Sequence, residues 1–310
     1  MIDKFYNSLY RSIKKMSVWN VLLLLLGIIF VLLIVHKRSF PQIEGFSQQE
    51  KFVVKKGSDI YDDFYADIYD DLFYKEIRNT YEVGSIINKT GPDSESLILD
   101  IGSGTGHIVD TFNNRGYKAV GLDKSKSMIE FAQDEYPNNE YVHGDALNAM
   151  IFPPESFTHI TCLDFTMYYI QDKRAFFDNC YRWLMPGGYM IIHLVNRQMF
   201  DPIVPAGKPL LLVSPQSHAK ERITNSSVKF NNFQYMSDFQ VFPNDFAQFK
   251  EVFTDDKTGK VRQNIHEYYM PTQKYILSQA KDVGFIMLAI IDLVKSQDEY
   301  QYLYVLQKPS

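Results

Sequence analysis

The chain has 310 residues, of which 45% are hydrophobic, a size and composition that allow one large folded core and argue against a disordered protein. Its formal net charge is −5, so it lacks the basic excess that binding to a nucleic-acid backbone requires, and we expect no nucleic-acid partner. The two cysteines, Cys162 and Cys180, fall inside an expected strand and an expected helix, which argues against a disulfide framework and favours a reducing compartment.

A long apolar segment lies near the N-terminus. Residues 18–35 are apolar apart from Asn20, and at about 1.5 Å per residue a helix of this length reaches about 27 Å, close to the thickness of a bilayer core. A helix buried in a soluble core would show a polar stripe, and a cleaved signal peptide would be followed by small residues rather than by the His-Lys-Arg run at 36–38. We therefore expect a transmembrane helix over residues 18–35, within an N-terminal tail and anchor of residues 1–38.

A polar stretch follows the apolar segment. Residues 39–57 contain Pro41, Gly45 and a Gln-Gln-Glu run, a composition typical of a flexible tether. The globular domain is expected to occupy residues 58–310. It opens with apolar residues at helical spacing, separated largely by aspartates, which predicts an amphipathic helix from Tyr61 to Phe73.

Short apolar runs then alternate with amphipathic helical patterns. This alternation is typical of βαβ units, in which a mostly parallel sheet is flanked by helices. The expected strands cover residues 97–101, 118–122, 140–143, 157–163 and 189–195, and the expected helices begin near residue 106 and cover residues 125–135 and 172–184.

The alternation stops after the fifth of these strands. Residues 197–267 are rich in Phe, Asn, Gln and Ser, and residues 255–260 separate two strand-like runs as a hairpin turn would, so we expect a β-rich insertion. A helix over residues 271–282 follows, and then two strands near residues 285–293 and 300–306. These last strands are too close in sequence for a helical crossover, and we expect them to pair antiparallel.

The strongest chemical signal is the segment from Leu97 to Gly106, L-I-L-D-I-G-S-G-T-G. An apolar strand carries an acid, Asp100, near its end, and the glycines that follow allow the backbone to turn sharply and to approach a ligand without a Cβ clash. The next helix presents free N–H groups at its N-terminus. A dinucleotide fingerprint, G-x-G-x-x-G, would place its third glycine where His107 stands, so the segment indicates a different cofactor.

This segment resembles the first motif of the class I S-adenosylmethionine-dependent methyltransferases, and the resemblance extends over most of the chain from Tyr61 to Leu306. Four further segments follow in the order of that family: G-L-D-K-S from Gly121, G-D-A from Gly144, the strand that runs to Asp164, and L-M-P-G-G from residue 184. The resemblance implies a seven-stranded, mostly parallel Rossmann-like sheet with an antiparallel last strand and helices on both faces. It also implies S-adenosyl-L-methionine as the cofactor.

The resemblance assigns roles to individual residues. Asp123 stands where the family's acid binds both ribose hydroxyls, and the two oxygens of a carboxylate suit such a diol. Asp145 stands where an acid accepts from the adenine amino group, and Asp100 can accept from loop donors or from the cofactor's ammonium group. A helix-capping role for Asp123, a turn role for Asp145 and a core role for the tyrosines of the first helix are the alternatives. The full expected cofactor set is Asp100, Gly102, Ser103, Gly104, Gly106, Asp123, Lys124, Met128, Asp145, Ala146, Asp164, Tyr61 and Tyr69.

No motif identifies the methyl acceptor. A sulfonium methyl group is already activated, so holding the acceptor atom in line can be sufficient, and a base is needed only when the acceptor must lose a proton. His266 and Tyr65 are our candidates for that base. No cysteine and histidine cluster has metal-ligand spacing, and we expect no metal. The insertion over residues 197–267 is expected to cover the carboxyl edge of the sheet and to select the substrate.

The sequence therefore predicts a membrane-anchored methyltransferase for a small-molecule or lipid-like acceptor, such as a quinone. Two alternatives stay open: a non-catalytic, membrane-proximal interaction protein that keeps the cofactor fold, and an NAD(P)-dependent dehydrogenase. Basic residues flank the apolar segment on both sides, so charge does not fix the topology. Because the cofactor is made in the cytosol and the cysteines are expected to be reduced, we expect a single-pass protein whose catalytic domain faces the cytoplasm.

Overall fold

The computed structural model describes residues 16–27, 46, 48–208, 216 and 219–310. The chain divides into two compact units, residues 1–45 and residues 46–310. In the first unit, residues 18–27 are helical. Within the described residues, no helix combines the length and the apolar character that crossing a bilayer demands, and residues 28–35 of the expected span lie outside the described part.

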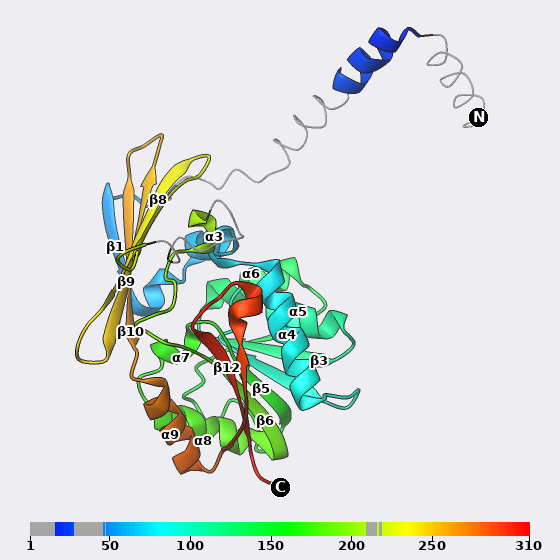
Figure 1. The fold of residues 1–310 in the computed structure, drawn as a ribbon, viewed down its shortest axis with the longest axis vertical. Helices are drawn as coiled ribbons and strands as arrows, with labels where there is room; N and C mark the ends of the chain where they lie inside the picture. The colour runs from blue at the N-terminus through cyan, green and yellow to red at the C-terminus, as the bar shows by residue number, and fades with distance from the viewer. Residues whose placement is uncertain (1–15, 28–45, 47, 209–215, 217–218) are drawn as a thin grey trace. The chain divides into compact units, whose positions relative to one another are not determined.

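The second unit is built on a seven-stranded sheet (Figure 1). Its strand order is β11-β12-β6-β5-β2-β3-β4, with the glycine-motif strand β2 near the centre and parallel to both of its neighbours. β12 runs antiparallel to β6 and to β11, which confirms the expected antiparallel last strand. The strands are β2 (Leu97–Ile101), β3 (Lys118–Asp123), β4 (Glu140–His143), β5 (Phe157–Cys162), β6 (Leu184–Val195), β11 (Ile286–Asp292) and β12 (Gln301–Gln307).

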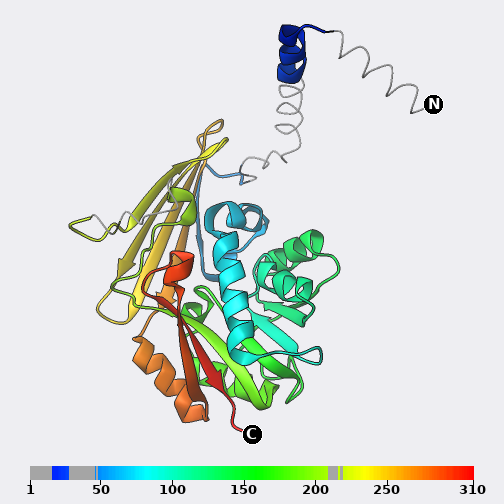
Figure 2. The same cartoon turned by 45° about the vertical axis from the view of Figure 1, so that its right-hand side comes forward.

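Helices cover this sheet. The buried apolar residues of α4 (Glu76–Thr90), α5 (His107–Asn114) and α6 (Lys126–Glu135) join one hydrophobic cluster with side chains of the strands, so these three helices share a face. Figure 2 shows α4 lying along the sheet. Two further helices, α8 (Lys173–Trp183) and α9 (Gln273–Val283), pack against each other. Burial of these apolar faces is the main term that holds the domain together.

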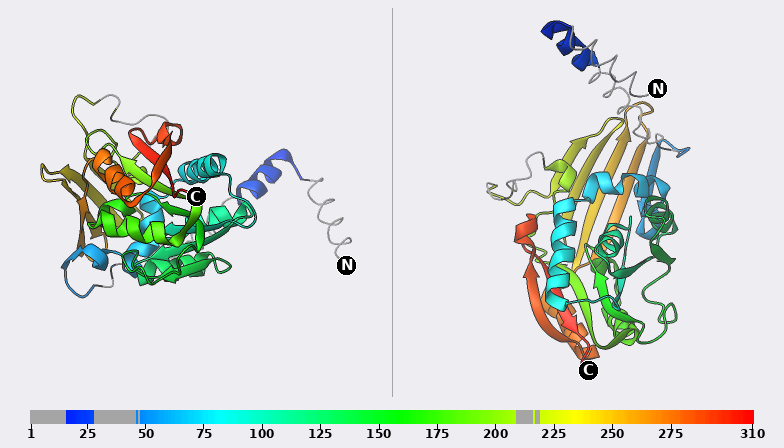
Figure 3. Two further views of the ribbon diagram at one scale, coloured as in Figure 1. Left: turned by 90° about the horizontal axis from the view of Figure 1, so that it is seen from below. Right: turned by 90° about the vertical axis from the view of Figure 1, so that its right-hand side faces the viewer.

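A second sheet of five strands stands beside the carboxyl end of the first, and we call it the cap sheet (Figure 3). Neighbouring strands from β7 to β10 are antiparallel, and the turn at residues 255–260 joins β9 to β10 as expected. Buried and exposed residues alternate along β8, so one face of the cap sheet is packed against the rest of the domain and the other is exposed to solvent. The cap strands are β1 (Phe52–Lys56), β7 (Asn225–Lys229), β8 (Phe233–Val241), β9 (Phe246–Asp255) and β10 (Val261–Tyr269).

β1 lies within the tether that we expect over residues 39–57. It pairs in parallel with β10, at the edge of the cap sheet, so residues 52–56 are a strand of the folded unit. None of its side chains is fully buried, and the sequence therefore carries little apolar alternation to signal a strand. The strand is placed by backbone hydrogen bonds to β10 rather than by its own side-chain pattern.

Two short elements connect the cap sheet to the first sheet. α3 (Asp63–Phe73), the amphipathic helix expected from Tyr61 onwards, buries Tyr65, Ile68 and Leu72 and contacts α6. α7 (Thr166–Tyr169) follows β5, at the carboxyl end of that strand, and contacts β10 of the cap sheet. The region between α3, α7 and the glycine motif is therefore enclosed by elements from both sheets.

Candidate active site

A pocket lies at the carboxyl end of β2, between the glycine motif and the helices α3 and α4. This is where ligands of open α/β sheets bind. The expected residues Asp100, Gly102, Ser103, Gly104, Asp164 and Tyr69 line it, together with Asp70, Phe73, Tyr74, Lys75, Arg78, Asn79, Glu82, Thr105, His107, Ile108 and Leu163.

The three glycines of the motif have different tasks. All three adopt positive φ angles, which only glycine takes up without cost. A Cβ on Gly102 would lie 2.4 Å from Thr166 Oγ1, and one on Gly106 would lie 2.4 Å from Tyr141 Oη, so these two positions are closed by the protein itself. A Cβ on Gly104 would meet nothing within 4 Å. The bare backbone at Gly104 therefore leaves room for a ligand that presses against the loop.

Asp123 ties this loop to the end of β3. Its Oδ2 accepts from the backbone N–H of Gly104 at 2.9 Å, and its Oδ1 accepts from the N–H of Ser125 at 2.8 Å. Burial raises the pKa of Asp123, while these backbone donors oppose the rise. Each oxygen keeps a second lone pair, so the carboxylate can hold the loop and still accept from two ribose hydroxyls. Its expected ribose role and a turn-holding role are compatible.

A charged wall faces the loop. Asp100 is buried and accepts from the Thr161 hydroxyl at 2.6 Å, rather than from donors of the glycine loop. Burial raises the pKa of Asp100 to about 7 and that of Glu82 to about 7. Arg78 lies 2.9 Å from Glu82 and 2.7 Å from Asp164, and these carboxylates outweigh the effect of burial and raise its pKa.

This donor set fits the amino-acid end of S-adenosylmethionine. That end carries an ammonium group and a carboxylate, and the pocket offers acceptors at Asp100 and Glu82 beside a guanidinium at Arg78. Sequence patterns missed Arg78 and Glu82, because their helix precedes every motif. The only signal was their spacing of four residues, which places both on one face of a helix.

The opposite wall binds α3 to the glycine motif. Asp70 of α3 accepts from the Thr105 hydroxyl at 2.7 Å, and its second oxygen lies 2.7 Å from His107 Nε2. The ring of Tyr74 stacks on His107 with 3.7 Å between ring centroids. His107, the residue that departs from the dinucleotide fingerprint, therefore fixes a helix against the pocket.

The other expected cofactor residues lie outside the pocket lining. Gly106 caps the N-terminus of α5, and Met128 and Ala146 are buried. Lys124 Nζ lies 2.7 Å from Asp145 Oδ2, and Asp145 also accepts from the N–H of Leu147. Their cofactor contacts, with the adenine role of Asp145, stay predictions.

The two candidate bases meet beneath the cap sheet. Tyr65 Oη lies 3.4 Å from Nε2 of His266, but the same nitrogen lies closer, at 2.7 Å, to Oε2 of Glu251. The other ring nitrogen, Nδ1, is hydrogen-bonded to the hydroxyl of Tyr169, which also accepts from Tyr61 at 2.7 Å. His266 is thus part of a buried chain of polar side chains rather than a lone base. Glu251 and Tyr169 were not foreseen from the sequence.

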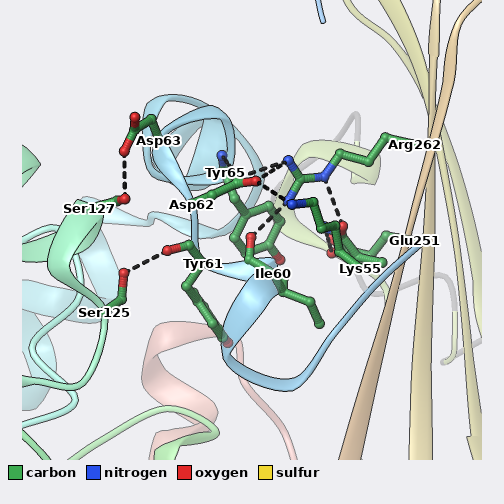
Figure 4. Close-up of polar contacts among 11 residues, drawn as sticks. Lys55, Ile60, Tyr61, Asp62, Asp63, Tyr65, Ser125, Ser127, Glu251 and Arg262 are labelled. Atoms are coloured by element: carbon green, nitrogen blue, oxygen red, sulfur yellow. Dashed lines mark hydrogen bonds and ion pairs between the residues drawn. The ribbon is translucent and has the colours of Figure 1, made fainter. Parts of the chain in front are cut away.

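The segment before α3 is held from both sides (Figure 4). Arg262 of the cap sheet donates to both carboxylate oxygens of Asp62, at 2.8 and 2.9 Å, and to the carbonyl of Ile60. On the other side, the Ser125 hydroxyl donates to the carbonyl of Tyr61 at 2.6 Å. Asp62 also caps α3 by accepting from the N–H of Tyr65. Tyr61 is therefore fixed between the cap sheet and the loop that follows Asp123.

Among the described side chains, no group of three or more His, Cys, Asp or Glu residues is placed to hold a metal ion. Cys162 and Cys180 are both free and buried.

Comparison with known proteins agrees with this geometry. Residues 99–192, which run from β2 through the glycine loop to β6, match the family model described as a methyltransferase domain. The chain carries a class I S-adenosylmethionine-dependent methyltransferase domain. The methyltransferase domain is similar over 142 residues, at 33% identity, to a dTDP-4-amino-2,3,4,6-tetradeoxy-D-glucose N,N-dimethyltransferase of Saccharopolyspora spinosa. That match covers 44% of this chain and 56% of the relative.

A second relative is the demethylmenaquinone methyltransferase of Chlorobaculum parvum, 29% identical over 167 residues, which are 52% of this chain and 64% of that protein. The chain therefore spans less than two thirds of the length of these curated relatives.

Solved structures extend the similarity to the whole methyltransferase fold. The CcbJ methyltransferase of Streptomyces caelestis aligns with a TM-score of 0.60 at 15% identity, over 81% of this chain and 98% of its own. An S-adenosylmethionine-dependent methyltransferase of Clostridium acetobutylicum aligns with a TM-score of 0.58 at 17% identity, over 79% and 98%. These values establish the fold of the domain.

Proposed function

We propose that this protein transfers a methyl group from S-adenosylmethionine to a small-molecule acceptor. The observation that carries the proposal is the open backbone of Gly104, held by Asp123 and facing the pocket in which Arg78, Glu82 and Asp100 converge. The last strand, β12, is antiparallel to its neighbour β6. This favours a methyltransferase over a dinucleotide-dependent dehydrogenase, in which the last strand of the sheet is parallel to the others.

Residues of the pocket, together with Asp123 behind the glycine loop, would hold the cofactor by its amino-acid end and by its ribose. Asp100 and Glu82 would accept from its ammonium group, Arg78 would pair with its carboxylate, and Asp123 would accept from its ribose. When bound, the cofactor supplies a methyl group that is already activated on a positively charged sulfur. The protein's task is then to hold the acceptor atom in line with that group, and alignment of this kind can lower a barrier by about 7–11 kcal/mol.

The acceptor would lie between the pocket and the cap sheet. The relatives named above are described as acting on an amino sugar nucleotide and on demethylmenaquinone, both small molecules. Aromatic side chains of α3, of the segment before it, of α7 and of β10 pack against one another, and we propose that they line the approach: Tyr61, Tyr65, Tyr69, Tyr169 and Tyr268. Such a lining suits a ring-bearing or amine acceptor.

The test incubates the full-length protein with methyl-labelled S-adenosylmethionine and a bacterial extract of membranes and cytosol. The lipid fraction and the polar small-molecule fraction of this extract are offered in separate reactions. We expect label in one small molecule. A chain that binds S-adenosylhomocysteine in a calorimeter but labels nothing would support the non-catalytic alternative. No heat with either the methyl donor or its demethylated product would refute the proposal altogether.

We also propose that residues 18–35 attach the protein to a membrane, with the methyltransferase domain on the cytoplasmic side. The support is the apolar sequence of that segment and the free cysteines of the domain. An anchor would raise the local concentration of lipid-like acceptors near the site. Protease treatment of sealed vesicles is the test, and a domain protected on the far side would contradict this topology.

A further inference from the structure

Four side chains from four separate segments of the fold form one hydrogen-bonded chain. Tyr61 precedes α3, Tyr169 ends α7, His266 lies on β10 and Glu251 lies on β9. The Tyr61 hydroxyl donates to Tyr169 at 2.7 Å, Tyr169 bonds Nδ1 of His266, and Nε2 of His266 lies 2.7 Å from Glu251.

The carboxylate of Glu251, at the buried end of this chain, sets the direction of every hydrogen bond in it. Glu251 is fully buried and accepts from the hydroxyl of Tyr235 at 2.9 Å and from the amide of Asn264 at 3.2 Å, and its Oε2 lies 2.7 Å from Nε2 of His266. A carboxylate only accepts, so Nε2 of a neutral His266 carries the hydrogen and Nδ1 must accept. Tyr169 then donates to Nδ1, the nearer acceptor, rather than to the Tyr268 hydroxyl 3.3 Å away, and its oxygen accepts from Tyr61. All the hydrogens therefore point inward, towards Glu251.

The outer end of the chain lies beside the cofactor pocket. The backbone carbonyl of Tyr61 accepts from Ser125, two residues after Asp123, which fixes this segment next to the expected ribose site. Besides burial, the pocket residue Tyr69 and Asp123 itself are close enough to the Tyr61 hydroxyl to raise its pKa. Burial, chiefly, raises the pKa of Tyr61 and of Tyr169 well above the usual value. Both phenols stay protonated at neutral pH, so each can pass one proton on while it accepts another. Because its own hydrogen points to Tyr169, the Tyr61 oxygen is left as an acceptor at this end.

We propose that Tyr61, Tyr169 and His266 form a proton relay that takes a proton from the methyl acceptor, and that Glu251 positions the histidine at its end. The inference rests on the proposed methyltransferase function and narrows its substrate class to acceptors that lose a proton, namely amines and hydroxyl compounds.

The step balances without a further reactant. A lone pair on the acceptor nitrogen or oxygen forms the bond to the methyl carbon, and the electrons of the carbon–sulfur bond go to the sulfur. The acceptor proton moves to the oxygen of Tyr61 as the Tyr61 proton moves to Tyr169 and the Tyr169 proton moves to Nδ1. The reaction ends with an imidazolium beside the carboxylate of Glu251, and the proton is later lost to water.

Two measurements on the full-length protein separate this relay from a purely structural network. The first is nitrogen NMR of the His266 ring, identified by its loss in His266→Gln, with S-adenosylhomocysteine bound. The relay requires a neutral ring with hydrogen on Nε2 and none on Nδ1 near pH 7.5, and Glu251→Gln should weaken this preference. A ring protonated on Nδ1, or one whose tautomer ignores Glu251→Gln, would overturn the proposal.

The second measurement is labelled methyl transfer to two probes, dTDP-4-amino-2,3,4,6-tetradeoxy-D-glucose and a catechol. For a probe that is methylated, Tyr169→Phe should lower kcat by about 10²- to 10⁴-fold with little change in KM, because general base catalysis contributes factors of this size. Tyr302→Phe is the matched control, because it removes a phenol of β12 whose neighbours are Asp292, Tyr300 and Tyr304 and not the residues of this hydrogen-bonded chain. A kcat within twofold of the wild type in Tyr169→Phe would overturn the relay.

Binding of S-adenosylhomocysteine keeps the two proposals apart. It should be the same in the wild type, Tyr169→Phe and Glu251→Gln, since none of these changes touches the cofactor pocket. If the wild type does not bind S-adenosylhomocysteine, the methyltransferase function itself is refuted. Retained binding with the wrong tautomer would refute the relay alone.

Discussion

The bond from Asp123 to the glycine loop makes a quantitative prediction about cofactor binding. Asp123→Asn keeps the shape of the side chain but offers one acceptor oxygen in place of two. Its amide group must then face the N–H of either Gly104 or Ser125, which now lie 2.9 and 2.8 Å from carboxylate oxygens. One hydrogen bond to a charged group is lost, worth about 1.5–3 kcal/mol. If the whole loss appears in binding, the dissociation constant rises by about 10- to 150-fold.

Isothermal calorimetry with S-adenosylhomocysteine and the full-length protein measures this change. The control is Asp134→Asn, the same substitution at an exposed position on α6. We expect a weakened Kd in Asp123→Asn and an unchanged one in the control. A Kd within twofold of the wild type in Asp123→Asn would show that the glycine loop does not depend on this carboxylate, and the ribose assignment would fail with it.

Three further predictions concern the same pocket. Gly102→Ala forces a Cβ to within 2.4 Å of Thr166 and should lower the free energy of unfolding by about 2–4 kcal/mol. Gly104→Ala meets no neighbour, so it should cost only the ~1–2 kcal/mol of the left-handed backbone, yet abolish the heat of S-adenosylhomocysteine binding. Equal effects of the two changes on thermal unfolding would contradict this division. Burial raises the pKa values of Asp100 and Glu82 to about 7, so the stability that their protonation gives the free protein is lost as pH rises through about 7. Affinity for the cofactor's ammonium group should grow over the same range. Asp100→Asn should flatten the pH profiles of stability and of affinity between pH 6 and 8, and profiles that run parallel to those of the wild type would argue against this role of Asp100. Arg78→Met leaves the carboxylates of Glu82 and Asp164 without their cation and should cost about 3–5 kcal/mol in thermal or urea unfolding, and an unchanged midpoint would mean that these acids are held by other groups.

The first sheet was predictable because its elements are written in local patterns. The strand expected over residues 140–143 is β4, and the strand expected over residues 97–101 is β2. Apolar runs between helical patterns identify buried parallel strands, and the short gap before residue 300 requires the antiparallel closing pair. The spacing of the glycines after β2 likewise predicted the cofactor loop, and all three adopt positive φ in the structure.

The missed parts depend on partners that are distant in sequence. Arg78 and Glu82 belong to the pocket only because α4 packs in one hydrophobic cluster with β2, and no motif surrounds them. Glu251 became visible through a register, since β9 pairs with β10 and sets Glu251 near His266. Tyr169 became visible through the contact of α7 with β10. A local pattern cannot report such a neighbour, because the residues that make it are 15 and 97 positions away from His266.

The edge strand β1 decides how a shortened form of the protein should be made. Its register ends with Lys56 opposite Ile265, the residue that precedes His266. Expression from Ser58 onwards would strip the backbone partner from β10, leave its N–H and C=O groups open to other chains, and invite aggregation. A version for crystallisation that keeps the relay strand covered should start at or before Phe46, where the compact unit begins.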